Sequence, residues 1–175
     1  RGIGIAYIRK GFIPLPLICG GGQEKGFRSG TENLPAIVAF AKAAEKVYEN
    51  REESFNRVNK LKNYFIGKLR DIPKVKINSE GDNYSPYVLS VSFVGIKGEV
   101  LLHLLEEKHI YVSTGSACSA RNNEESHVLK AIGLGKEELD GTIRFSFTED
   151  NSLEEIDYTL DVLVKSLKFL RRVGR

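Results

Sequence analysis

Cys118 is a thiol within a segment of small polar residues, STGSACSA (residues 113–120). A structural cysteine usually packs among large apolar side chains, so this context favours an accessible thiol that could act as a nucleophile. No histidine or aspartate stands beside Cys118 to act as a base, so papain-like chemistry has no support. From this segment alone, a bystander thiol on a loop is the simplest interpretation.

Arg144 stands inside the short apolar pattern TIRFS, residues 142–146. An unpaired guanidinium is costly to bury, so an arginine in such a strand needs a partner or an outward position. An internal salt bridge or a solvent-facing side chain is one interpretation. A bidentate clamp for a ligand carboxylate is the other, and the pattern favours neither.

A glycine-rich segment, GGGQEKGFRSGT (residues 20–31), precedes a predicted helix and ends in Thr31. A hydroxyl and free amides before a helix can hold a phosphate. The spacing matches neither the P-loop nor the dinucleotide fingerprint, so it indicates a phosphate site only weakly.

The three histidines, His103, His109 and His127, do not have the spacing of metal ligands. We expect core or surface roles for them and no metal site. His127 opens a short predicted helix in which Val128, Ala131 and Ile132 are expected to pack.

Composition excludes several classes of protein. The 26 Lys and Arg against 23 Asp and Glu give a net charge of +3, too mild to indicate nucleic-acid binding. Cys19 and Cys118 are too far apart to suggest a disulfide framework, and no apolar run approaches a membrane span of about 20 residues. We therefore expect a cytoplasmic protein. The start at Arg1, without an initiator Met or signal peptide, suggests that an upstream part is missing.

The first part of the chain predicts a strand over residues 4–9, a Pro- and Gly-rich loop over 10–30, and a helix over 33–70. Asn33 is a suitable N-cap, and Pro35 is tolerated in the first turn. Unless it kinks near residues 50–51, this helix is about 57 Å long, which suits a connection between two domains.

The rest of the chain predicts strands alternating with helices. Strands are expected over 74–78, 88–93, 110–113 and 142–147, and helices over 99–108, 126–132 and 153–171, with a loop over 114–125. These elements predict a two-layer α/β or α+β domain over residues 74–175.

Four segments taken together are more specific than any one alone. GGGQEKGFRSGTEN, STGSACSA, SHVLKAIGL and TIRFS, in this order, closely resemble the C-terminal part of cysteine desulfurases of the NifS/IscS type, which are class V pyridoxal-phosphate enzymes. The resemblance covers essentially the whole chain. It implies a remnant of the large cofactor-binding domain (1–32), a connecting helix (33–73) and the small C-terminal domain (74–175) of a pyridoxal-phosphate-dependent transferase.

The resemblance also implies roles for three residues. Cys118 matches the nucleophile that takes the sulfur of L-cysteine, leaving alanine and an enzyme persulfide for a sulfur-acceptor protein in iron–sulfur cluster or thiolation pathways. Arg144 matches the arginine that pairs with the substrate carboxylate. Thr31 matches the threonine that reaches the pyridoxal phosphate of the neighbouring subunit, which implies a homodimer. Arg28 and His127 lie in family motifs and are given supporting roles.

The chain also departs from the family pattern. None of its lysines matches the Schiff-base lysine, which in relatives stands just before the Gly-Ile-Gly strand, and the histidine that stacks on the cofactor is absent. Ser90 stands where relatives often have Asn, and Phe147-Thr148 replaces a common Leu-Gly or Phe-Gly.

We therefore expect the C-terminal portion of a cysteine desulfurase that is inactive on its own. A stand-alone module that binds a sulfur-acceptor protein, and a related selenocysteine lyase, are the alternatives. The upstream DNA sequence and the relative rates on cysteine and selenocysteine would discriminate them.

Overall fold

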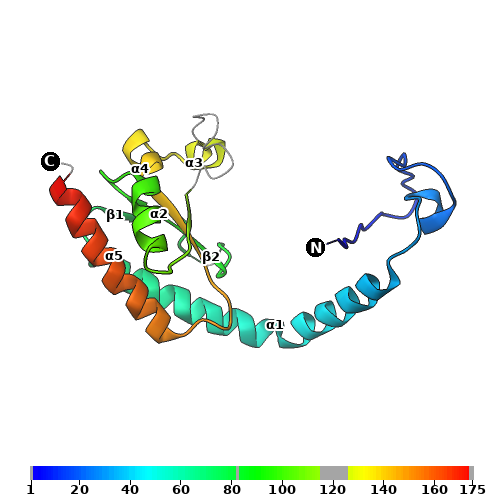
Figure 1. Ribbon diagram of the computed structural model, residues 1–175, viewed down its shortest axis with the longest axis horizontal. Coiled ribbons are helices and arrows are strands. Elements are labelled where there is room, and N and C mark those ends of the chain that lie inside the picture. Colours follow the sequence, from blue (N-terminus) through cyan, green and yellow to red (C-terminus); the bar gives the residue numbers. More distant parts are fainter. Residues whose placement is uncertain (1, 82, 115–125, 174–175) are drawn as a thin grey trace. The chain divides into compact units, whose positions relative to one another are not determined.

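The long helix expected over residues 33–70 is present as α1, Leu34–Leu69, in the computed structural model (Figure 1). The Asn33 side-chain oxygen accepts a hydrogen bond from the backbone N–H of Ala36 at 3.2 Å, which is the expected N-cap. Pro35 lies in the first turn, where a missing N–H leaves no helical bond unmade. Asn33 and Pro35 therefore suffice to predict where this helix begins.

The structure describes residues 2–81, 83–114 and 126–173. The chain divides into two units, Arg1–Arg51 and Glu52–Arg175. The boundary falls within α1, so the C-terminal half of this helix belongs to the same unit as the elements that follow it.

The second unit is built on a four-stranded antiparallel sheet of order β1-β2-β4-β3. Its strands are β1 (Val75–Ile77), β2 (Val88–Phe93), β3 (Ser113–Thr114) and β4 (Thr142–Ser146). The helices of this unit are the end of α1, α2 (Gly98–Glu106), α3 (His127–Ala131), α4 (Lys136–Asp140) and α5 (Leu153–Val173). This arrangement confirms the mixed α/β, specifically α+β, class.

One hydrophobic core joins the sheet to the helices. Alternate residues of the two central strands are buried, because successive side chains of a strand point to opposite faces. The buried set is Leu89, Val91, Phe93, Ile143 and Phe145. These side chains belong to one cluster with buried residues of α1, α2 and α5. The opposite face of β2 and β4 carries serine, threonine and arginine besides Val88, and is therefore mostly polar.

The strand predicted over residues 4–9 is absent, and that prediction was wrong. Residues 2–9 have no regular structure, and Ile5 and Tyr7 are 84% and 90% exposed. A strand needs a neighbour for its backbone hydrogen bonds, and no described segment of the first unit pairs with these residues. The apolar pattern of residues 4–9 was therefore not enough to predict a strand.

Two further expectations need correction, and one helix was missed. The third strand is Ser113–Thr114 rather than 110–113, and α4 was not predicted. In α3 only Leu129 is buried, while Val128 and Ile132 are 56% and 50% exposed and Ala131 is exposed, so the expected packing of these three residues was wrong. A helix of five residues is too short for its periodicity to be informative.

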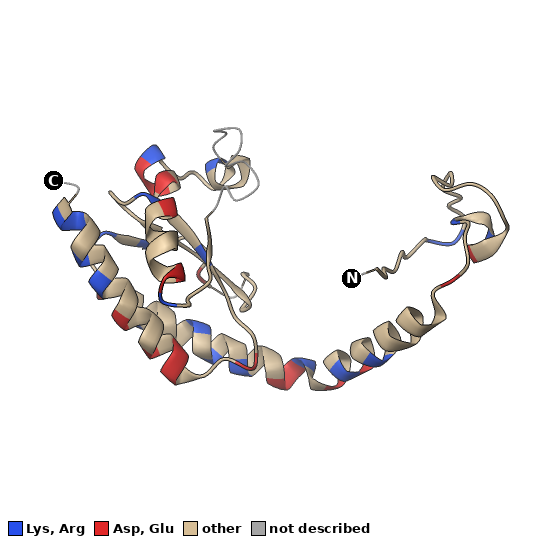
Figure 2. Ribbon diagram, in the orientation of Figure 1, with Lys and Arg blue, Asp and Glu red and all other residues tan. Residues whose placement is uncertain are grey.

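Charged residues of both signs are interspersed along α1 and α5 (Figure 2). An example is Lys42, whose ammonium group lies 2.6 Å from the carboxylate of Glu45, one turn further along α1. No helix in the described part of the chain has the length and apolar character needed to cross a membrane.

Candidate functional site

Arg144 lies in a row of polar residues that crosses β3, β4 and β2 and ends just beyond β1. Its Cα pairs with Ser90 on β2 and with Ser113 on β3. The backbone N–H of Asn78, just beyond β1, bonds to the carbonyl of Ser90 at 2.9 Å and extends the row. Directly opposed residues share a face of the sheet, so Asn78, Ser90, Arg144 and Ser113 form what we call the polar row.

The position of Arg144 bears on one possibility that the sequence left open, the internal salt bridge. Its side chain is exposed, and it makes no hydrogen bond or ion pair with any residue that the structure describes. It is therefore an outward-facing guanidinium rather than half of an internal salt bridge. No described residue occupies its donors, and Ser90 and Ser113 are half-buried on the neighbouring strands.

A hydrogen-bond network supports one end of the polar row. Asn78 Nδ2 lies 3.3 Å from Ser90 Oγ and 2.8 Å from Ser92 Oγ. Ser92 Oγ lies 2.8 Å from Thr142 Oγ1, which donates to the carbonyl of Glu138 at 2.6 Å. Ser92 and Thr142 are buried, so satisfying these hydroxyls avoids a desolvation penalty.

Helix α4 is held beside this network by the Glu138 carboxylate. It accepts a hydrogen bond from Lys76 Nζ at 2.8 Å and another from the backbone N–H of Gly135 at 2.9 Å. The hydrogen bonds from Lys76 and then Gly135 hold the pKa of Glu138 below its usual value of about 4.5.

This lowered pKa predicts a contribution of Glu138 to acid stability. A carboxyl group whose pKa is lower in the folded protein stabilises it above the unfolded-state pKa, and this stabilisation is lost as pH falls through the folded-state pKa. Glu138→Gln is therefore expected to flatten the dependence of unfolding free energy on pH below about 4.5. Urea unfolding at a series of pH values measures this, with Glu137→Gln as the control. Equal slopes for Glu138→Gln and the unsubstituted chain would contradict it.

Thr31 belongs to the first unit, at the end of a tightly bonded loop. Ser29 N–H donates to the carbonyl of Ile18 at 3.1 Å, and Ser29 Oγ donates to that of Gly21 at 2.8 Å. Gly30 donates its N–H to Gln23 Oε1 at 3.2 Å and has φ +113°, a conformation that suits glycine. These bonds fold the glycine-rich segment around the buried Ser29 and leave Thr31 exposed, two residues before the cap of α1.

Arg28 has the supporting position expected of it. Its Nη1 donates to the carbonyl of Ser29 at 2.8 Å, so the guanidinium closes the loop beside Gly30. A Cβ at Gly30 would lie 2.7 Å from Arg28 Nη1, so a larger residue there would disturb this contact. The motif RSGT therefore determines the local loop structure and also supplies the exposed hydroxyl of Thr31.

Cys118 lies outside the residues that the structure describes. The segment that carries it begins directly after Thr114, which pairs with Ile143 beside Arg144. The other cysteine, Cys19, is an exposed free thiol that contacts the carbonyl of Pro16 at 3.6 Å.

No group of three or more histidine, cysteine or acidic residues in the described ranges is placed to hold a metal ion. His103 Nδ1 lies 3.3 Å from Glu106 on the same helix, α2. His127 is the exposed first residue of α3.

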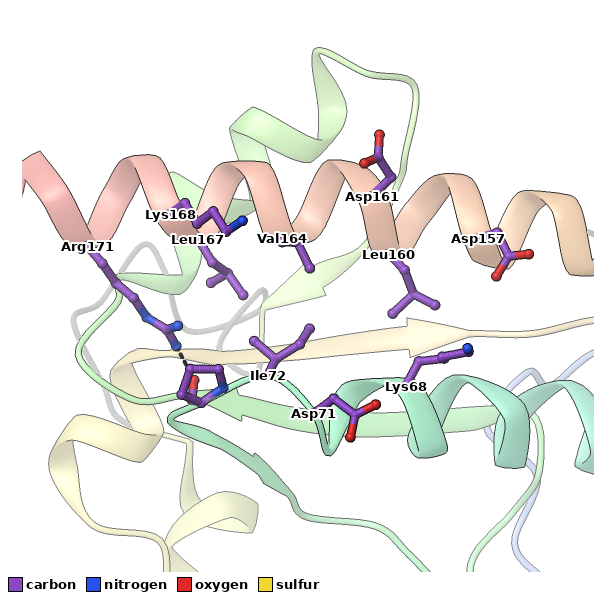
Figure 3. Close-up of a pocket in the computed structure, with 11 residues that line it drawn as sticks. Lys68, Asp71, Ile72, Asp157, Leu160, Asp161, Val164, Leu167, Lys168 and Arg171 are labelled. Atoms are coloured by element: carbon purple, nitrogen blue, oxygen red, sulfur yellow. Dashed lines mark hydrogen bonds between the residues drawn. The ribbon is translucent and has the colours of Figure 1, made fainter.

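A separate groove of about 530 Å³ lies between the end of α1 and α5 (Figure 3). Ile72, Leu160 and Val164 give it an apolar lining, and Arg171 closes one end by donating to the carbonyl of Pro73 at 2.6 Å. Neither Arg144 nor Thr31 lines it, so the groove is distinct from the polar row.

Residues 1–159 match the family model described as aminotransferase class-V. The chain belongs to this family. It is 42% identical over 177 residues to the protein named cysteine desulfurase IscS of Clostridium botulinum, covering 99% of this chain and 45% of that protein. It is 41% identical to the IscS of Methanosarcina thermophila, again covering 99% of this chain and 43% of that protein. The chain thus spans less than half the length of these relatives.

Solved structures of the family share the fold of this class-V aminotransferase chain. A structure named NIFS-like protein matches with a TM-score of 0.83 and 40% identity, over 94% of this chain and 42% of that one. The NifS-like protein of Rickettsia africae matches with a TM-score of 0.80 and 30% identity, over 90% and 41% of the two chains. These findings confirm the resemblance to NifS/IscS-type proteins and the expected fold.

Class-V aminotransferases of this type imply pyridoxal phosphate, and the described residues fit only part of it. The exposed hydroxyl of Thr31, before the N-terminus of α1, is suited to a phosphate oxygen. The family resemblance assigns no lysine of this chain to the Schiff-base position. Thr31 could therefore contact the phosphate, and no described residue is assigned to the cofactor ring.

Sequence reasoning noted Ser90 only as a departure from the family and did not single out Asn78 or Ser113. The alternation of polar and apolar residues in VLSVSF and TIRFS was the available signal, because it puts Ser90 and Arg144 on the faces opposite the core. That Ser90 and Arg144 stand opposite each other could be learned only from the strand register in the structure.

Proposed function

We propose that this chain carries the sulfur-accepting part of a cysteine desulfurase, which converts L-cysteine to L-alanine and a protein persulfide. In this proposal Cys118 takes the sulfur, Arg144 binds the substrate carboxylate, and Thr31 contacts the pyridoxal phosphate of a neighbouring subunit in a homodimer. The names of the relatives support the activity. The observation that carries the assignment is the exposed Arg144, beside the strand from which the Cys118 segment leaves.

The proposed division of labour follows from side-chain chemistry. Bound pyridoxal phosphate supplies an electron sink for bonds at the substrate carbons. The Arg144 guanidinium fixes the substrate by two parallel hydrogen bonds to its carboxylate. The Cys118 thiolate attacks the substrate sulfur, so that a sulfur–sulfur bond forms and the carbon–sulfur bond breaks. The bonding electrons stay on carbon, which takes up a proton to become the methyl group of alanine.

Delivery of this sulfur completes the proposed function. An acceptor thiol attacks the outer sulfur of the Cys118 persulfide and regenerates the thiol. The acceptor is a protein of iron–sulfur cluster assembly or of a thiolation pathway, and the location is the cytoplasm. The free thiol of Cys19 is compatible with such a reducing compartment.

These 175 residues alone are expected to be inactive, because none of the lysines matches the one that binds the cofactor. Purified chain mixed with pyridoxal phosphate and L-cysteine should release no more alanine than the same mixture without the protein. The full-length Clostridium botulinum relative, assayed in parallel, is the positive control. Alanine released in proportion to persulfide on Cys118 would contradict the expected inactivity. Comparing the rates on cysteine and selenocysteine in a full-length enzyme that contains this chain tests the lyase alternative.

A further inference from the structure

We propose that Ser90, Arg144 and Ser113 together form a three-donor carboxylate site, in which the Ser90 hydroxyl supplies a hydrogen bond that Arg144 alone cannot. This inference rests on the proposed role of Arg144 and adds residues to it. The three residues stand side by side on β2, β4 and β3. Directly opposed Cβ atoms in antiparallel strands are about 4.5–5.5 Å apart, so both hydroxyls stand next to the start of the arginine side chain.

The hydrogen-bond network leaves the proton of Ser90 unused. Thr142 Oγ1 donates its only proton to the carbonyl of Glu138 at 2.6 Å. In the 2.8 Å contact between the two hydroxyls, Ser92 must therefore be the donor. Ser92 then has no second proton, so it accepts from the Asn78 amide at 2.8 Å.

This order of donors also sets the orientation of the Asn78 amide. Its nitrogen must face the serines, because a carbonyl oxygen there would leave the Ser92–Thr142 contact without a proton. The same nitrogen carries a second N–H, which Ser90 Oγ accepts at 3.3 Å. Ser90 is thus an acceptor within the network, and its own hydroxyl proton has no acceptor among the described residues.

A carboxylate is the ligand that suits these donors. The guanidinium of Arg144 presents donors in a planar fork, and the hydroxyls of Ser90 and Ser113 stand beside the base of its side chain, one on each neighbouring strand. Two carboxylate oxygens accept about four hydrogen bonds, so the ligand has room for all of these donors. The exposed Arg144 and the half-buried serines leave these donors accessible, whereas Ser92 and Thr142 of the supporting network are buried.

The test is a titration of the isotope-labelled chain with propionate, a carboxylate that lacks amine and thiol, followed by amide NMR at constant ionic strength. Saturable shifts are expected at the amides of Ser90, Ser113 and Arg144. Ser90→Ala is expected to weaken binding about tenfold, the effect of one hydrogen bond to a charged group. Ser90→Thr keeps the hydroxyl and should retain the affinity. Ser166→Ala, on α5, is the matched control and should change nothing.

The outcomes separate this inference from the proposed function. If Arg144→Gln abolishes binding while Ser90→Ala leaves it unchanged, the role of Ser90 is overturned and that of Arg144 stands. If Arg144→Gln has no effect, the proposed role of Arg144 fails as well. Absence of saturable shifts along these strands in the unsubstituted chain overturns the three-donor site. Unchanged amide dispersion in each variant confirms that it is folded.

Discussion

Cys118→Ser is expected to lower alanine formation by at least about a thousandfold in an active enzyme that contains this chain. A serine hydroxyl is not ionised near neutral pH and cannot become a persulfide. A thiol with the ordinary pKa of about 8.5 is already a few per cent thiolate under these conditions, and its sulfur is intrinsically nucleophilic. The loss should therefore appear in the catalytic rate.

A chimera provides the setting for this measurement. The N-terminal part of the Clostridium botulinum relative, up to the position aligned with Arg1, would be joined to this chain. Alanine release is assayed with L-cysteine, and mass spectrometry locates the added sulfur. Cys19→Ser is the matched control, because Cys19 is the other thiol of the chain and should be dispensable. Full activity in Cys118→Ser, or a folded but inactive parent chimera, would contradict the proposed function.

Features encoded by neighbouring residues were predictable from the sequence. The N-cap at Asn33 and the tolerated Pro35 located the start of α1, because both act within one helical turn. The strand Val88–Phe93 was predicted to the residue, because its polar and apolar residues alternate. The outward position of Arg144 was one of several possibilities that the sequence left open, since alternation places a residue on a face without naming its partners.

Features that depend on distant residues were not predictable in this way. The segment 4–9 has an apolar pattern typical of a strand, yet no described neighbour pairs with it. Helix α4 is short, and the bond from Lys76 on β1 to Glu138 spans 62 positions of sequence. The free proton of Ser90 follows from contacts among Asn78, Ser92 and Thr142, which come from three separate segments. Local patterns contain no information about such contacts.

Phe65 is the best single point at which to test the packing of the second unit. This residue of α1 is 1% exposed. Its ring meets Phe145 on β4 edge-on at a centroid distance of 5.0 Å, and Phe147 beyond β4 at 6.0 Å. Such edge-to-face pairs stabilise the fold beyond the free energy gained by burying the rings. Phe65 therefore joins the helix to the strand that carries Arg144.

Phe65→Ala is expected to lower the unfolding free energy by about 3–5 kcal/mol, because a buried aromatic ring is lost and a cavity remains. Urea unfolding followed by far-UV circular dichroism measures the change, since the chain has no tryptophan to serve as a fluorescent probe. Phe55→Ala, on the same helix but 46% exposed, is the control and should change stability far less. Equal losses for the two variants would show that the end of α1 is not packed on the sheet through Phe65. A selective loss would show that the strand carrying Arg144 is held in place by this helix.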